Sequence, residues 1–174
     1  MTSPSLRIES LPGFSPMIGR LVGMLTYVRH TTLHAVSGLT TSQLDHLHDA
    51  ESNSIGALLS HMATVERVYQ ITSFDGRVLS SAEEAQFADA LALGESGRRT
   101  LRGRTIQYHL DELASVRNAT LAGLAARDDA WLDRSLASAP AMNAHWAWFH
   151  VAEDEISHRG QIRWLRARIP VAHD

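Results

Sequence analysis

The chain has 174 residues, of which 44% are hydrophobic and 20% charged, and its formal net charge at pH 7 is −3. This length suits one globular domain with its own core, and the small negative charge excludes a broad attraction to nucleic acid or to anionic membranes. All 16 basic residues are Arg and Cys is absent, which excludes a lysine Schiff base, a disulfide and a protein thiolate. Any thiol chemistry would need a thiol supplied as co-substrate.

The first 14 residues are predicted to form an extended arm, because Pro4, Pro12 and Gly13 interrupt them and no periodicity is visible. They lack a basic segment followed by an apolar run, and no stretch of about eighteen apolar residues occurs in the chain. We therefore expect a soluble cytoplasmic protein without a membrane partner, folded as a single domain over residues 1–174.

The first predicted helix begins at Pro16, with Ser15 as its N-terminal cap, and ends before Gly38. Apolar residues recur along one face to about residue 37: Ile18, Leu21, Val22, Leu25, Val28 and Val36. We interpret Gly19 and Gly23 as ordinary packing positions rather than as a place where another helix comes close.

A polar connection spans residues 39–52, and one short helical turn is predicted at residues 42–47. It carries two histidines among acidic residues: Asp45, His46, His48, Asp49 and Glu51. Because polar surface loops produce such clusters by chance, we do not favour a metal site here.

The second predicted helix starts at the Asn53/Ser54 cap and extends to about Ser73. His61 lies beside its apolar face, which is formed by Ile55, Leu58, Leu59, Met62, Val65 and Val68. A lone His in such a position is usually packed or hydrogen-bonded, so His61 by itself does not indicate a ligand. We expect Glu66 either to orient a ligand or to pair with an Arg.

Residues 74–104 are too many for a simple bundle loop and indicate a long crossover connection between helices 2 and 3. A short helix is predicted from Ser81 to about Leu91. A basic cluster follows: Arg98, Arg99, Arg102 and Arg104. We interpret this cluster as a solvated surface, and the alternative is a clamp for the carboxylates of an anionic ligand.

The third predicted helix spans residues 105–127, with apolar residues at helical spacing. We place His109, Asp111 and Glu112 on its exposed polar side. Residues 131–136 are predicted to be extended, before Asn143 caps the last helix.

The last predicted helix, over residues 141–169, carries His150, Asp154 and His158 at four-residue steps. Each step advances only about 40° around a helix, so the three side chains share a face, which is typical of helical metal ligands. The pairs His150–Asp154 and Asp154–His158 satisfy this spacing equally, and a third ligand must come from elsewhere.

Three roles are open for His150: a partner that orients the Asp154 carboxylate, an alternate ligand, or a core side chain packed against Trp146. Glu155 is rotated about 100° from the stripe, and we expect it to form a salt bridge with Arg159. Four aromatic residues of this helix are expected to cover the core and a homodimer interface: Trp146, Trp148, Phe149 and Trp164.

The segments HVAEDEIS (residues 150–157) and HRGQIRWLR (residues 158–166) together resemble the last helix of the DinB-like superfamily of small four-helix proteins. PMIGRLVGMLTYVR (residues 16–29) resembles the first helix of one branch, and NSIGALLSHMATVERVYQ (residues 53–70) resembles the second. The first of these segments begins at residue 16 and the last ends at residue 166, so the resemblance extends over more than half of the chain. The resemblance implies an all-α fold, a DinB-like four-helix bundle.

In that superfamily one His of the second helix and two residues four apart on the last helix hold a metal, which implies His61, Asp154 and His158 here and leaves His150 outside the set. The branch that resembles mycothiol-dependent maleylpyruvate isomerase carries a carboxylate at the middle position, usually Glu, so the shorter Asp154 is a departure. Two His and one carboxylate accept zinc, nickel or iron.

The resemblance to the isomerase branch and to thiol transferases implies that the protein is a metal-dependent transferase or isomerase. Such an enzyme would use a low-molecular-weight thiol, mycothiol or bacillithiol, and would act on a small electrophile. Two alternatives stay open: a hydrolase that uses metal-bound water, and a non-catalytic bundle that binds a metal or a partner. The sequence contains neither a Gly-rich phosphate loop nor a GxSxG nucleophile elbow.

Overall fold

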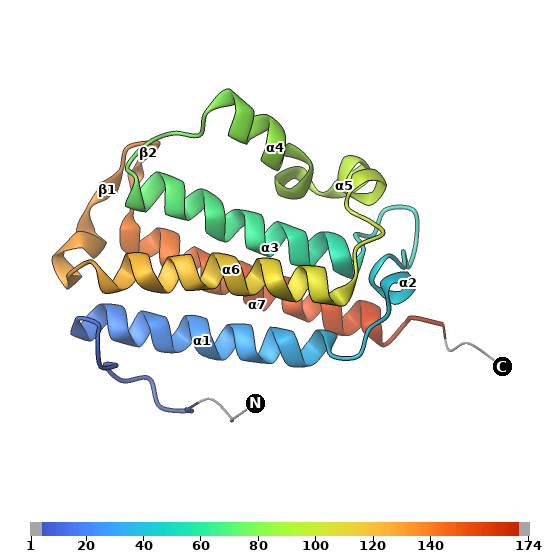
Figure 1. Cartoon of the computed structure of the whole chain (residues 1–174), viewed down its shortest axis with the longest axis horizontal. Helices are drawn as coiled ribbons and strands as arrows, with labels where there is room; N and C mark the ends of the chain where they lie inside the picture. Colours follow the sequence, from blue (N-terminus) through green and yellow to red (C-terminus); the bar gives the residue numbers. More distant parts are fainter. Residues whose placement is uncertain (1–4, 171–174) are drawn as a thin grey trace.

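Four long helices lie side by side as a bundle in the computed structural model, which describes residues 5–170 (Figure 1). They are α1 (Pro16–Val36), α3 (Ile55–Tyr69), α6 (Ile106–Ala125) and α7 (Ala144–Arg166). α1 packs on α6 and α7, and α3 packs on the same two helices, so the four helices close a ring around a common core. The structure confirms the predicted all-α four-helix bundle.

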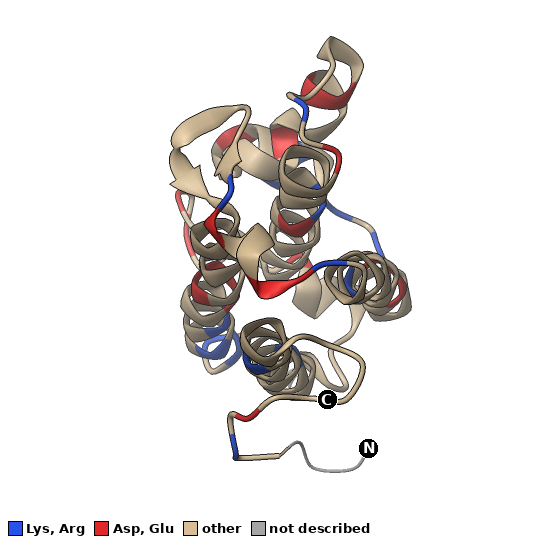
Figure 2. Cartoon of the chain, turned by 90° about the vertical axis from the view of Figure 1, so that its left-hand side faces the viewer, with Lys and Arg blue, Asp and Glu red and all other residues tan. Residues whose placement is uncertain are grey.

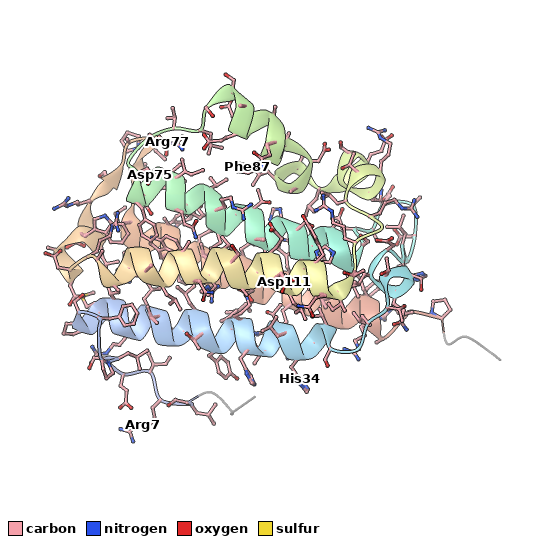
Figure 3. All side chains as sticks on the ribbon, in the orientation of Figure 1. Arg7, His34, Asp75, Arg77, Phe87 and Asp111 are labelled. Carbon is pink, nitrogen blue, oxygen red and sulfur yellow. The ribbon has the colours of Figure 1, made fainter. Side chains whose placement is uncertain are left out.

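Shorter elements occupy the connections: α2 (Thr41–Leu44), η1 (Gln70–Phe74), α4 (Ser81–Ala92), α5 (Gly94–Thr100), η2 (Asp129–Asp133), β1 (Ser135–Leu136) and β2 (Ala139–Asn143). η1 is a π-helical turn that continues α3, so helical backbone reaches the predicted end of the second helix. The crossover between α3 and α6 contains α4 and α5, and α4 lies over α3 (Figure 1). Phe87 of α4 is buried and lies between α4 and α3 in Figure 3.

The connection between α6 and α7 differs from the prediction of an extended segment over residues 131–136. Its first part is the 3-10 turn η2, because Trp131 and Leu132 turn inward and are buried in the core. Only Ser135 and Leu136 are extended, as strand β1 of an antiparallel hairpin with β2. α7 therefore starts after β2, at Ala144, directly after the predicted cap Asn143.

Polar side chains cap the starts of α3 and α7 as predicted. The Ser54 hydroxyl accepts the N–H of Ala57 at 3.1 Å, and the Asn143 side-chain oxygen accepts the N–H of Trp146 at 2.8 Å. These bonds satisfy backbone donors that have no partner within the helix. They fix where both helices begin.

The start of α1 is capped from a distant part of the chain, which corrects the prediction for Ser15. The Ser15 side chain accepts no cap hydrogen bond from the helix. Instead, Asp129 of η2 accepts the N–H groups of Met17 and Ile18 at 3.0 and 3.1 Å. A carboxylate at a helix N-terminus also interacts favourably with the helix dipole, which a hydroxyl does not.

Figure 2 shows Arg residues and acidic residues interspersed over the helices, as the small net charge of −3 suggests. Among the aromatic residues of α7, Trp148 is fully buried, whereas Trp146, Phe149 and Trp164 are 41–52% exposed. The homodimer interface stays a prediction. Within residues 5–170, no helix combines the length and the apolar character needed to cross a membrane.

A network of four charged side chains lies inside the bundle, with one residue from each long helix: Arg29, Glu66, Arg117 and Glu155. Each guanidinium contacts both carboxylates, at N–O distances of 2.7–3.2 Å. In every helix the charged residue lies between one apolar cluster and the next, so the network separates two halves of the core. Burial opposes ionisation of Glu66, but Arg117 and Arg29 hold its pKa below the ordinary value.

This network tests the predictions made for Glu66 and Glu155. Glu66 pairs with arginines, which is one of its two expected roles. The predicted salt bridge between Glu155 and Arg159 is wrong, because Glu155 faces the bundle axis and is only 1% exposed. Arg159 instead donates a hydrogen bond to the Thr31 hydroxyl.

Gly19 is where the segment before α1 packs against the helix. A Cβ atom at Gly19 would lie 2.5 Å from the backbone nitrogen of Leu11, whereas a Cβ at Gly23 would meet nothing within 4 Å. We expect Gly19→Ala to lower the free energy of unfolding by about 1–3 kcal/mol through overpacking. Gly23→Ala is the matched control, and it should raise the same free energy by about 0.5–1 kcal/mol because Ala is the better helix former. Urea denaturation measures both, and equal stabilisation would contradict the contact at Leu11.

Candidate metal centre

His61 of α3 faces Asp154 and His158 of α7, and the two helices run in opposite directions (Figure 1). Nε2 of His61 lies 3.4 Å from Oδ1 of Asp154, and Nε2 of His158 lies 3.2 Å from the same oxygen. The three side chains are 12–13% exposed, and their donor atoms all lie within 4.8 Å of one another. The structure thus brings together the three residues that the resemblance implied.

Both imidazoles are oriented by a hydrogen bond on the ring nitrogen that faces away from Asp154. Nδ1–H of His61 donates to the carbonyl oxygen of Ala90 in α4 at 2.7 Å. Nδ1–H of His158 donates to the side-chain oxygen of Gln161 at 3.4 Å. Because a carbonyl oxygen only accepts, Nδ1 carries the proton in the neutral ring and the lone pair of Nε2 points to Asp154. Metal-binding histidines are oriented in this way.

The donor set fits a divalent metal ion. At bond lengths near 2.1 Å and bond angles of about 90–110°, two ligand atoms lie roughly 3.0–3.4 Å apart. The two contacts of Asp154 with the imidazoles, at 3.4 and 3.2 Å, match that separation. The shorter Asp154 therefore reaches both histidines, and two imidazole nitrogens with one carboxylate oxygen suit zinc, nickel or iron.

The negative charge of Asp154 favours a proton on His61, and a metal ion must displace this proton to bind. Burial disfavours ionisation of Asp154, but hydrogen bonds donated by Nε2–H of His158 and His61 in their protonated forms hold its pKa well below the ordinary value. Burial also disfavours the charged form of His61, yet Asp154 and the Ala90 carbonyl raise its pKa above the ordinary value of 6.5. His61 thus keeps its proton to a higher pH than a free imidazole does.

We therefore expect the affinity for zinc to rise with pH until His61 has lost its proton. Below the raised pKa of His61, the affinity should fall by about tenfold per pH unit, because one proton is released for each metal ion bound. Competition with a chromophoric chelator at several pH values between about 5 and 8 measures this slope. An affinity that stays constant over this range would exclude His61 as a ligand.

His150 lies one turn before Asp154 on α7, outside the group of three donors. Its ring stacks on Trp146 with the centroids 4.9 Å apart and the planes at 11°. Its Nδ1 lies 3.2 Å from the hydroxyl of Tyr69 in α3. Of the three predicted roles, the structure shows the packing of His150 against Trp146. This contact lies at a partly exposed face of α7 and not in the core, because Trp146 is 41% exposed.

Tyr69 is a residue of this site that the sequence reasoning missed. It follows His61 by eight residues, or two steps of four, so helical spacing alone could have placed both on one face of α3. Burial raises the pKa of the Tyr69 hydroxyl, and the negative charge of Asp154 raises it further. Tyr69 is therefore a neutral hydrogen-bond donor beside the metal centre.

The cluster Arg98, Arg99, Arg102 and Arg104 does not converge on one site. Arg98 donates to a backbone carbonyl, and Arg99 pairs with an acidic residue one turn away in α5. Arg104 lies over the ring of Tyr108 at 4.8 Å, and Arg102 is exposed. The interpretation as a solvated surface fits these contacts.

His109 of α6 is buried, which corrects its placement on the exposed side of the helix. It is 2% exposed, and burial, assisted by the charge of Arg104, lowers its pKa to about 4. It lies beneath the crossover connection, whose position a helical pattern does not reveal. In the loop between α2 and α3, the ring of His48 packs edge-on against Trp164 with the centroids 4.7 Å apart. No second group of three metal-binding side chains occurs within residues 5–170.

A family model described as mycothiol-S-transferase matches residues 20–170, which covers α3, α7 and all three candidate ligands. Among the curated proteins, no match is found.

Proposed function

This chain belongs to the mycothiol-S-transferase family of the DinB-like superfamily, and from this premise we propose that it is a metal-dependent thiol transferase. His61, Asp154 and His158 hold a divalent ion, with zinc, nickel and iron as the candidates. The thiol is a low-molecular-weight co-substrate, mycothiol before bacillithiol, and the acceptor is a small electrophile.

The observation that carries this proposal is the donor set in a chain without cysteine. Three ligand atoms within 4.8 Å leave further coordination positions for an exogenous ligand. Because the protein has no thiol of its own, the nucleophilic sulfur must come from the co-substrate. Bound at this centre, a divalent ion supplies Lewis acidity, which lowers the pKa of a coordinated thiol toward neutrality.

In this proposal, Tyr69 and His150 take the proton that the thiol loses. The Tyr69 hydroxyl passes its proton to Nδ1 of His150, 3.2 Å away, and accepts the thiol proton in its place. The sulfur then forms a bond to an electrophilic carbon of the acceptor. The displaced electron pair leaves with a leaving group, or stays on the acceptor, which takes up the proton from His150.

Tyr69→Phe tests this proton path. We expect the transfer rate to fall about 100-fold, within the usual range for a general base, while the affinity for zinc changes less than about twofold. Tyr108→Phe, at an exposed tyrosine of α6, is the matched control and should keep the full rate. Equal rates in the two variants would remove Tyr69 from the mechanism.

The transferase activity itself is tested with zinc-loaded protein, a panel of thiols and a small electrophile, followed by mass spectrometry of the conjugate. We expect conjugation with mycothiol at least about 100-fold faster than without protein, and the uncatalysed rate with Asp154→Ala. Hydrolysis of the electrophile without any thiol would support a hydrolase instead. A protein that binds metal but accelerates neither reaction would support a non-catalytic binding role.

A further inference from the structure

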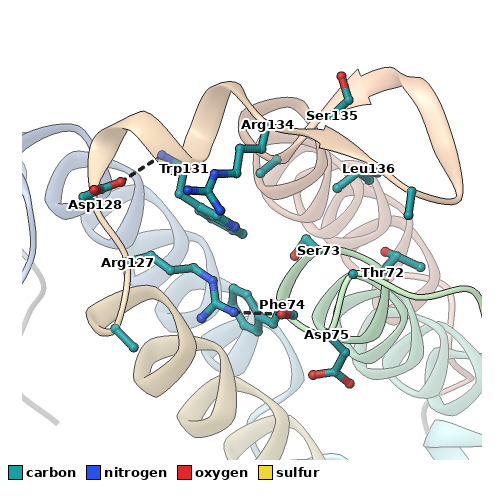
Figure 4. Close-up of a pocket in the computed structure, with 14 residues that line it drawn as sticks. Thr72, Ser73, Phe74, Asp75, Arg127, Asp128, Trp131, Arg134, Ser135 and Leu136 are labelled. Carbon is teal, nitrogen blue, oxygen red and sulfur yellow. Dashed lines mark hydrogen bonds between the residues drawn. The ribbon is translucent and has the colours of Figure 1, made fainter.

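A cavity of about 730 Å³ lies at the end of the bundle where η1, η2 and the β1–β2 hairpin meet (Figure 4). Ala144, the first residue of α7, lines it. Asp154 follows ten residues later, so the cavity lies roughly 15 Å from the metal centre along the helix. None of the three candidate metal ligands lines this cavity.

Arg127 is fixed in the wall of the cavity. Its guanidinium donates to the carbonyl oxygens of Gly123 at 2.6 Å and Phe74 at 2.9 Å. It also lies over two aromatic rings, 4.3 Å from the centroid of Phe74 and 5.0 Å from that of Trp131. These contacts set the position of the positive charge without neutralising it, because none of the partners is a carboxylate.

Arg134 brings a second positive charge to the same wall. Its side chain lines the cavity together with Arg127 and Trp131 (Figure 4). Burial lowers the pKa of Arg127; of the neighbouring charges, Asp75 raises this pKa, and Arg134, with a smaller effect, lowers it. Within residues 5–170, neither arginine forms an ion pair.

The two carboxylates that line the cavity are engaged elsewhere. Asp128 accepts the N–H of Trp131 at 3.0 Å and caps η2. Asp75 lies 3.8 Å from Nε of Arg77 and forms no ion pair with Arg127, although its charge acts on Arg127 as well. Neither carboxylate therefore lies within ion-pair distance of Arg127 or Arg134, the two arginines that line the cavity.

We propose that this cavity is a second ligand site, which binds a small molecule through an oxyanion group held between Arg127 and Arg134. Arg presents a planar fork of N–H donors that matches a carboxylate or a phosphate, and an anion between two guanidinium groups relieves their repulsion. The apolar lining at Trp131 and Leu136 accommodates the remainder of the ligand. The site is independent of the metal centre and of the proposed transferase activity.

The test uses inorganic phosphate and benzoate as separate probes, added to the metal-free full-length protein at constant ionic strength. NMR follows the arginine Nε–H signals, and thermal unfolding follows the stabilisation by each anion. We expect saturable shifts of the Arg127 and Arg134 signals with at least one probe, and the stronger probe identifies phosphate or carboxylate as the preferred group. Arg134→Gln, at an exposed residue, should weaken binding by at least about tenfold.

Arg102→Gln is the matched control, because it removes an exposed Arg of the crossover connection and changes the net charge equally. It should leave the binding constant within about twofold, since a remote surface charge acts only through screened electrostatics. Equal weakening in both variants, no saturable response to either probe, or the same response to chloride would overturn the proposal.

Discussion

Asp154→Ala should abolish metal binding at the His61 centre. Oδ1 of Asp154 lies within 3.4 Å of both imidazole nitrogens, so its removal takes away the only anionic donor of the group. Loss of a residue that merely orients a ligand costs about 10–100-fold in metal affinity, and we expect the loss of this ligand to exceed that range. Elemental analysis of the purified untagged protein and chelator competition with zinc measure the effect.

Glu153→Ala is the matched control for this experiment, because it removes the neighbouring carboxylate from an exposed position of the same helix. It should keep about one metal ion per chain. His61→Ala and His158→Ala should behave like Asp154→Ala, since each donates one atom to the group. Full metal content in Asp154→Ala would mean that the ion binds elsewhere, and no metal in the wild-type protein even after addition of zinc, nickel or iron would refute the site.

Glu66→Gln should lower the free energy of unfolding by about 3–5 kcal/mol. The variant keeps the shape of the side chain but leaves Arg29 and Arg117, both 6% exposed, with one carboxylate between them. Breaking a buried ion pair on one side is costly because the remaining charge has lost its solvation by water and its partner. Urea denaturation followed by circular dichroism near neutral pH measures the change.

A half-exposed pair serves as the control for the buried network. Glu112 lies 3.4 Å from Arg67 and its side chain is 39% exposed, so Glu112→Gln should cost less than about 1 kcal/mol. Replacing all four network residues together by apolar side chains should recover much of the loss, because the desolvation cost then disappears as well. If Glu66→Gln cost no more than Glu112→Gln, the network would not hold the helices together.

The network also makes the stability of the fold depend on pH in the acid range. The pKa of Glu66 in the folded protein lies below its ordinary value of 4.5, so its contribution to stability is complete above that pH. The contribution is lost as the pH falls through the depressed pKa of the folded state. Because Glu66 and Glu155 belong to α3 and α7, this network also fixes the two helices that carry the candidate metal ligands.

Local sequence determined the four long helices, because apolar residues at three- and four-residue steps define a buried face whatever the rest of the chain does. It also determined the caps at Ser54 and Asn143, which act within three residues of their own position. Spacing likewise placed Asp154 and His158 on one face of a helix. The family resemblance added His61, which nothing in its own helix distinguishes from a packed histidine.

Only the tertiary structure decided the rest, because those features depend on which surface of another helix comes near. Spacing could not separate the pair His150–Asp154 from Asp154–His158, and the packing of α3 on α7 placed His61 beside the second pair. Glu155 was predicted to form a surface salt bridge, but it is a buried partner of Arg29 because its face of α7 meets that residue across the bundle. Asp129 caps a helix more than a hundred residues away in the sequence, a contact that exists only once the chain has folded.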